Sequence, residues 1–189
     1  NPPTWTTTLG PNFSTPYDSD FVSVNGALYV NSQTQECALE TGQYSYNSST
    51  HEMTLNLGPG MPPPAIYVKI RDRGFNILTS NYVTIEGFAV VRARRQGIRI
   101  LGQDSTHRSV GVVVTDCEVT DNARQGIHFE YASTASAINN TVHHNYGHGI
   151  YLLTSDHCLI QGNASYNNDN PLRPGIKGGT AGIKVGDAK

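Results

Sequence analysis

Several features that define familiar protein classes are missing from this sequence of 189 residues. No apolar run reaches the roughly 18 residues of a membrane-spanning helix, and the sequence does not open with a basic segment followed by an apolar one. The three cysteines, Cys37, Cys117 and Cys158, cannot all pair with one another and show no zinc-type spacing. We therefore expect three small buried thiols, and neither a disulfide framework nor a zinc site.

Charge and apolar content are also low. The 13 basic and 15 acidic residues leave a formal charge of −2, which gives no reason to expect nucleic acid or an anionic membrane as a partner. Hydrophobic residues make up 37% of the chain, whereas glycine occurs 19 times. Length and composition together indicate one domain with a small appendage, many turns and a narrow core.

A five-residue unit of Gly, apolar, variable, apolar, variable recurs from residue 74 onward. Its glycines are 23, 29, 23 and 33 residues apart, and the units are 74–78, 97–101, 126–130, 149–153 and 182–186. A second apolar segment follows in each interval, at 85–88, 114–117, 137–140 and 160–163. Alternation with period two is typical of half-buried strands, and the intervening turns leave no room for helices. The repeat predicts an all-β protein, a parallel β-helix whose coils pair with those above and below.

Turn residues of this repeat also recur at fixed offsets. We expect each glycine to open its strand at a sharp bend, where a positive φ is convenient. Asparagines fall into two columns, one of Asn140 and Asn163 and the other of Asn122, Asn145 and Asn168. Stacked amides can hydrogen-bond along the axis and satisfy turn groups that water cannot reach. The sequence therefore predicts asparagine ladders.

The two ends of the chain differ from this repeat. Strand-forming residues at 21–30, around Asn25-Gly26, and at 44–57 predict two hairpins, and a strand is expected from Ile66 after the stiff segment Pro59–Pro64. We assign residues 1–72 to a small antiparallel β cap and residues 73–189 to about four coils, incomplete at the C-terminus. The uncapped last coil predicts a natural chain that continues beyond Lys189, with end-to-end self-assembly as the alternative.

The repeat from Arg73 to Val185 resembles the right-handed β-helix proteins related to polysaccharide lyases, including pectate lyases and alginate epimerases. The resemblance rests on Asn-Thr-Val-His-His-Asn at 140–145, Gly-His-Gly-Ile-Tyr-Leu at 147–152 and Ile-Gln-Gly-Asn-Ala-Ser-Tyr-Asn-Asn at 160–168. It implies a right-handed coil, a secreted, extracellular protein, an acidic polysaccharide as partner, and lyase chemistry with a lysine or arginine base and acidic residues that hold calcium. The Asp-Pro-His-Asp signature of the epimerases is absent.

Apolar residues at the second and fourth places of each unit should face inward, so the third and fifth places should face solvent. The third-place residues, here called the outward column, are Asn76, Arg99, His128, Tyr151 and Lys184. The fifth-place residues are Leu78, Leu101, Glu130, Leu153 and Gly186. We expect neighbours in a column to lie one strand apart, about 4.8 Å, and to form a groove for an anionic sugar chain.

Elimination of a uronic-acid polymer removes the proton α to a carboxylate and requires its charge to be neutralised. Arg99 is a candidate for the neutralising cation, and His128, Tyr151 or Lys184 is a candidate for the base. Asn76, Glu130 and Tyr151 are candidate substrate-binding residues, and Tyr151 could instead be a stacking platform for a sugar ring. His143, His144 and His148 share one turn. This arrangement could indicate a metal site, but histidines in such a turn are more often surface groups.

The charged residues elsewhere support weaker hypotheses. Arg92, Arg94 and Arg95 form a basic patch that we interpret as a solvated edge. Five aspartates near turns are possible calcium ligands, but they fall at unmatched offsets: Asp116, Asp121, Asp156, Asp169 and Asp187. The leading hypothesis is a polysaccharide lyase. A glycan-binding or assembly module without catalysis and a glycoside hydrolase remain alternatives, although Glu130 is the only outward strand carboxylate for the hydrolase pair.

Overall fold

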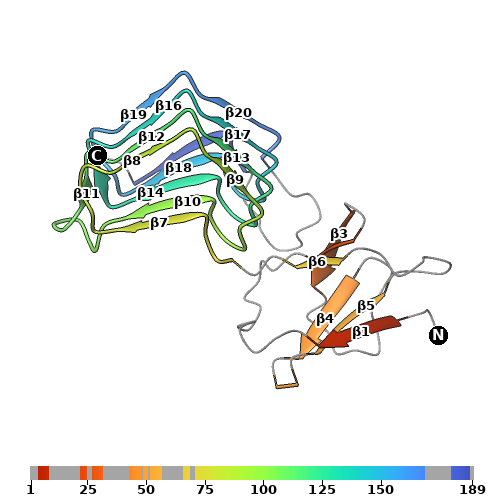
Figure 1. The fold of residues 1–189 in the computed structure, drawn as a ribbon. Helices are drawn as coiled ribbons and strands as arrows, with labels where there is room; N and C mark the ends of the chain where they lie inside the picture. Colours follow the sequence, from red (N-terminus) through yellow and green to blue (C-terminus); the bar gives the residue numbers. More distant parts are fainter. Residues whose placement is uncertain are drawn as a thin grey trace. The chain divides into compact units, whose positions relative to one another are not determined.

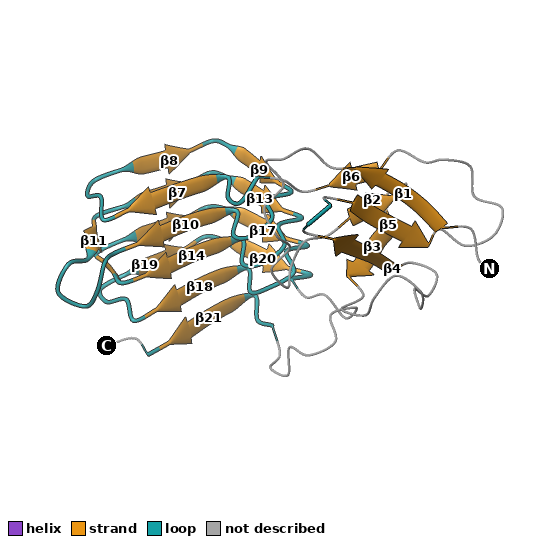
Figure 2. Cartoon of the chain, turned by 90° about the horizontal axis from the view of Figure 1, so that it is seen from below, coloured by secondary structure: helices purple, strands orange, loops and turns teal. Residues whose placement is uncertain are grey.

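The computed structural model describes residues 4–8, 22–24, 27–31, 43–47, 49–50, 52–56, 66–68, 71–168 and 180–187. All regular structure in these residues is β-strand (Figure 1) (Figure 2). The chain divides into two compact units, residues 1–70 and residues 71–189. Cys37, His51, Asp169 and the segment Pro59–Pro64 lie outside the described residues.

The N-terminal unit is one six-stranded sheet with the strand order β1-β5-β4-β3-β2-β6. Its strands are β1 (Thr4–Thr8), β2 (Val22–Val24), β3 (Ala27–Asn31), β4 (Gln43–Asn47), β5 (Glu52–Asn56) and β6 (Ile66–Val68). Neighbouring strands are antiparallel except β3 and β4, which pair in parallel. Both predicted hairpins are confirmed, as β2–β3 and β4–β5. Tyr44, Met53 and Leu55 are fully buried in this unit.

The second unit is a parallel β-helix with three sheets, which Figure 1 shows as stacked coils. The glycine sheet consists of β7 (Phe75–Leu78), β10 (Ile98–Leu101), β14 (Ile127–Glu130), β18 (Ile150–Leu153) and β21 (Ile183–Gly186). The second sheet consists of β8 (Thr84–Glu86), β12 (Val113–Thr115), β16 (Ser136–Ile138) and β19 (Leu159–Gln161). The third consists of β9 (Ala89–Val91), β13 (Glu118–Thr120), β17 (Thr141–His143) and β20 (Ala164–Tyr166), and a short pair is formed by β11 (Ser109–Val110) and β15 (Ala132–Ser133).

The register of the glycine sheet is the one that the repeat predicts. Ile98 pairs with Phe75 on one side and Ile127 on the other, and the row continues through Ile150 to Ile183. Ile98, Ile127 and Ile150 are completely buried, whereas Ile183, in the last described strand, is 46% exposed. Each apolar place of the five-residue unit therefore forms one internal row of side chains, as expected for strands that stack in phase.

The glycine that opens each strand has a different role from the one expected. Positive φ occurs at three described glycines, Gly87, Gly111 and Gly162, and none of these opens a strand of the glycine sheet. A Cβ on Gly126 would overlap Cγ1 of Val142 and would lie 2.8 Å from the carbonyl oxygen of Gly149. Glycine is required there because the third sheet packs against the strand entrance, so the expectation of a positive φ was wrong.

Left-handed residues instead precede the asparagine ladders. Asp116, Asn139 and Gly162 occupy one such position in successive coils, with φ between 52° and 67°. Asp121, His144 and Asn167 occupy another, with φ between 50° and 55°. The next residue in each coil is Cys117, Asn140 or Asn163 at the first position, and Asn122, Asn145 or Asn168 at the second. A left-handed corner therefore comes directly before each ladder side chain.

The predicted asparagine ladders are confirmed. Asn122 donates from Nδ2 to Oδ1 of Asn145 at 2.8 Å, and Asn145 donates in the same way to Asn168 at 3.0 Å. The second ladder joins Asn140 to Asn163 at 2.9 Å. Backbone groups are also satisfied, because Asn145 Nδ2 donates to the Val119 carbonyl at 2.9 Å. Cys117, which is buried, stands in the column of Asn140, and Cys158 is only partly buried.

We expect Asn145→Ala to lower the free energy of unfolding by about 2–4 kcal/mol, because it leaves buried donors of Asn122 and the Val119 carbonyl without partners. Asn163→Ala should cost less, since Asn163 is only partly buried at the end of its ladder. Urea unfolding of the two variants and the parent protein measures the difference. Equal losses in the two variants would contradict the ladder as a buried network.

Candidate functional site

The outward column predicted from the sequence exists on the glycine sheet. Arg99 pairs with Asn76 and His128, Tyr151 pairs with His128, and Lys184 pairs with Tyr151. The structure therefore brings these five residues together on five consecutive strands. Asn76 and Lys184 are exposed as predicted, and Arg99 and Tyr151 are partly exposed.

Tyr151 is enclosed by its column neighbours. Its ring stacks on the His128 ring, with centroids 5.0 Å apart and planes 5° apart. On the other side, where β21 follows β18, Nζ of Lys184 lies 5.6 Å from the ring centroid. Gly186 provides room for this ring, because a Cβ there would lie 3.2 Å from the Tyr151 hydroxyl. Tyr151 thus presents its edge and hydroxyl to a ligand, and a role as a stacking platform would require Lys184 to move away from the ring.

His128 departs from the prediction that third-place residues face solvent. It is only 5% exposed, although it stands in the outward column between Arg99 and Tyr151. Neither ring nitrogen has a hydrogen-bond partner among the described residues. Burial lowers the pKa of His128 to about 4, with Glu130 opposing the shift and Arg99 reinforcing it. The imidazole is therefore neutral at pH 7, with a free lone pair on one ring nitrogen.

Glu130 binds a protein group in this structure. Its Oε2 accepts a hydrogen bond from an Nη of Arg99 at 3.0 Å, and the two side chains are about one-fifth exposed, at 22% and 20%. The pair joins the third and fifth places of neighbouring strands. Glu130 therefore orients the Arg99 guanidinium, whose Nε has no hydrogen-bond partner among the described residues.

Another column, missed by the sequence analysis, lies beside the outward column. It consists of the residues immediately before the strand glycines: Arg73, Gln96, Gln125 and His148. Arg73 Nε donates to Gln96 Oε1 at 3.1 Å. The His148 ring lies 5.1 Å from the Tyr151 ring, and its Nδ1 accepts the Ala181 amide hydrogen at 3.0 Å. The signal was available in the sequence, because a long polar side chain precedes each of the first four glycines.

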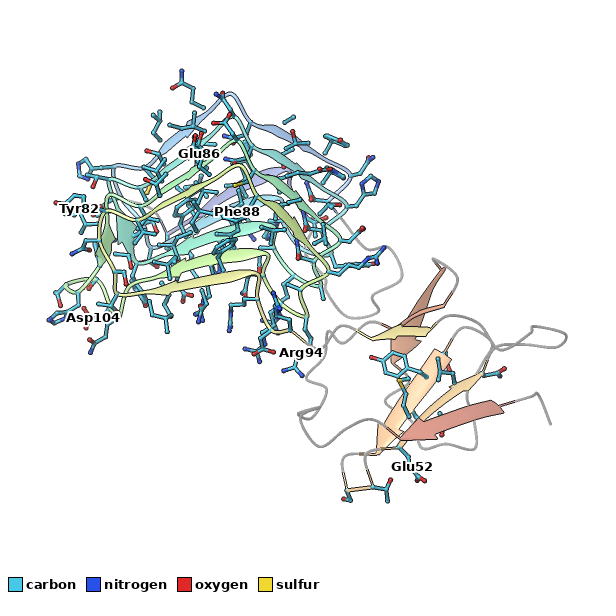
Figure 3. All side chains as sticks on the ribbon, in the orientation of Figure 1. Glu52, Tyr82, Glu86, Phe88, Arg94 and Asp104 are labelled. Carbon is cyan, nitrogen blue, oxygen red and sulfur yellow. The ribbon has the colours of Figure 1, made fainter. Side chains whose placement is uncertain are left out.

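The predicted basic patch is not a uniformly solvated edge. Figure 3 shows Arg94 at the turn between β9 and β10, at the other end of the coil from Tyr82. Arg94 is 7% exposed, and its guanidinium contacts Oδ1 of Asp72 through Nε at 2.8 Å and through an Nη at 2.6 Å. Arg92 is exposed and Arg95 is half-buried. The side chains of this turn therefore divide between an internal ion pair and the surface.

The three histidines of one turn do not form a cluster. His148 lies beside Tyr151, whereas His143 and His144 contact each other, with their Nδ1 atoms 2.7 Å apart. The Nε2 atom of His143 is 3.1 Å from Oε1 of Glu118, and its ring stacks on Tyr166. In the described part of the chain, no group of three or more His, Cys, Asp or Glu side chains could hold a metal ion. The structure therefore separates His148 from the pair formed by His143 and His144.

The face combines cations, a neutral imidazole and a phenol in one line. Burial raises the pKa of Tyr151, so its hydroxyl keeps its proton at neutral pH, and burial lowers the pKa of His148. Arg99 and Lys184 stand at the two ends of the His128–Tyr151 stack. Such a line can bind negative groups at its ends and can hold or move a proton in between.

A parallel β-helix with a row of polar side chains on one sheet defines the class of this protein. The family described as right handed beta helix region matches residues 65–189, which is more than half of the chain. The chain therefore belongs to the right-handed β-helix family. No curated protein and no solved structure matches it. Within the described residues, no helix is long and apolar enough to cross a membrane.

The buried His128 should make stability depend on pH. Its pKa falls from 6.5 to about 4 on folding, so between these values the unfolded chain binds more protons and stability decreases as the pH falls. The loss should total about 3 kcal/mol, and His128→Phe, which keeps a ring against Tyr151, should remove it. Urea unfolding of both proteins from pH 7 to pH 4 provides the measurement, and parallel curves would rule out a buried neutral His128.

Proposed function

We propose that this chain is a secreted protein that binds an acidic polysaccharide along the outward column and cleaves it by β-elimination. The observation that carries this proposal is the line of Arg99, His128, Tyr151 and Lys184 on consecutive strands. Cations at both ends attract a polyanion, and the groups between them have the protonation states that elimination needs. The resemblance of the repeat to polysaccharide lyases supports the same reaction.

In the proposed reaction, a base takes the proton α to a uronate carboxylate. The electron pair forms a carbon–carbon double bond as the glycosidic C–O bond breaks, and the leaving oxygen takes a proton. Neutral His128 supplies the base, and Tyr151, whose raised pKa keeps its hydroxyl protonated, supplies the proton to the leaving oxygen. Because Tyr151 covers His128, substrate binding has to displace the Tyr151 ring. Lys184 neutralises the carboxylate charge.

Calcium is implied by the resemblance, but the described residues do not fit it. They contain no group of three or more acidic, histidine or cysteine side chains arranged around one point. Asp187 and Glu130 are the carboxylates whose charges act on Tyr151, and Glu130 is already bound to Arg99. No step of the proposed reaction therefore passes through calcium, and charge neutralisation is assigned to side chains of this chain.

Glycan binding without cleavage is a second candidate function, favoured by one specific observation. Both ring nitrogens of His128 are buried under its neighbours, and Arg99 is held by Glu130. If Tyr151 does not move, the line has no accessible base and acts only as a binding surface. This candidate predicts saturable binding of the same polymers with no unsaturated product.

The experiment incubates the protein with polygalacturonate, alginate and a glycosaminoglycan and follows the ultraviolet absorbance of unsaturated products. We expect Tyr151→Phe, which keeps the ring stack, to lower kcat by about 10²-fold or more with little change in polymer binding. Lys184→Ala should weaken binding and cleavage together. The matched control is Glu86→Gln on the exposed face of the second sheet, which should behave as the parent protein.

Absence of both binding and product with every polymer would end the proposal. Binding without product would leave the non-catalytic candidate. A Tyr151→Phe protein that cleaves as fast as the parent would remove Tyr151 from the proton transfer.

A further inference from the structure

Four arginines gather where the chain turns into the first three strands of the glycine sheet. The Arg124 amide donates to the Arg95 carbonyl at 3.2 Å, and the Arg95 amide donates to the Asp72 carbonyl at 2.8 Å, so these turns stack coil on coil. Arg73 precedes β7, and Arg99 lies in β10. The pKa of Arg73 is lowered first by burial and then by the charges of Arg99, Arg95 and Arg124. We call these four side chains the arginine cluster.

Two carboxylates of this region are already bound to arginines. Asp72 binds Arg94 closely, at 2.6 Å, but lies 3.9 Å from Arg73. Glu130 binds Arg99 at one Nη. Asp72 is the one carboxylate among the charges that act on Arg73, and it opposes three arginines there. Like charges that face one another in a half-buried place are costly unless a counter-charge joins them.

Unsatisfied polar atoms point to the same place. Among the described residues, Nε of Arg99, Oε1 of Gln125 and both ring nitrogens of His128 are buried without a hydrogen-bond partner. His128 is 5% exposed and feels the charges of both Arg99 and Arg73. Buried groups of this kind normally have partners. Of these atoms, Nε of Arg99 and one nitrogen of the neutral His128 ring are hydrogen-bond donors. Unpaired donors beside several arginines fit an oxyanion with several acceptor oxygens.

We propose that the arginine cluster is an anion subsite that binds a carboxylate or sulfate group of the polysaccharide. This inference rests on the proposed function and adds a binding place for one negative group of the polymer. Lys184 lies three strands beyond Arg99 in the glycine sheet, which places it about 14 Å along the axis at about 4.8 Å per strand. One sugar acid cannot reach both places. The ligand is therefore an oligomer with negative groups on separate sugars, one of them held by the arginine cluster.

Arginine side-chain signals test this subsite directly. Inorganic sulfate and glucuronate are titrated separately into ¹⁵N-labelled full-length protein while the arginine Nε–H resonances are followed by NMR. We expect a saturable shift of the Arg99 and Arg73 signals. The double variant Arg73→Gln/Arg95→Gln should lose that response and bind the polymer at least 10-fold more weakly, with a smaller dependence on salt. Arg71→Gln, an exposed arginine of the same segment, is the matched control and should behave as the parent.

The outcomes separate the two proposals. A sulfated dextran and polygalacturonate, compared in the same assay, distinguish sulfate from carboxylate as the preferred group. Unchanged arginine signals with both small anions, or full polymer affinity in a double variant that keeps its thermal unfolding midpoint, would overturn the subsite while leaving the proposed function intact. If small anions shift the arginine signals but no polymer binds the parent protein, the proposed binding of polysaccharide is contradicted. The arginine cluster would then be a site for small anions.

Discussion

Hydrogen bonds between strands one coil apart determine where every functional side chain of the β-helix lies. Each strand of the glycine sheet pairs in phase with its neighbours, so equal places in the repeat become columns in space. The asparagine ladders act at the corners, where the chain leaves one sheet for the next and backbone groups would otherwise lack partners. Register is thus maintained both along the strands and at the turns between them.

Much of this arrangement could be predicted because it depends on periodicity. Alternation with period two and the spacing of the glycines predict the strands and the register. The asparagines at fixed offsets predict both ladders. The role of the glycines was not visible in the same way. Gly126 is compatible with a positive φ and with close packing, and only the position of Val142 shows that packing is the reason. The sequence shows where a glycine occurs, but only the fold shows whether that glycine adopts a positive φ or allows close packing.

The candidate site was predicted in outline for the same reason. Register placed Arg99, His128, Tyr151 and Lys184 in one column, but the burial of His128 depends on how the side chains around it pack. Alternation predicts the face of the sheet on which a side chain lies. It does not predict how far neighbouring side chains bury that side chain. The column that begins with Arg73 was missed because the unit was counted forward from its glycine. The bend brings the preceding residue beside the outward column, as the contact of His148 with Tyr151 shows.

Stacking in register can also destabilise the β-helix, because it can bring like charges close together. In-register strands place similar positions about 4.8 Å apart, so cations in adjacent coils repel one another unless something intervenes. Glu130 intervenes for Arg99, and Asp72 intervenes for Arg94. Arg73 has weaker compensation, because its contact with Asp72 is 3.9 Å long. Folding alone would favour a second carboxylate or an apolar side chain there. The proposed anion subsite accounts for an arginine cluster that keeps its positive charge there, because a bound negative group would supply the missing compensation.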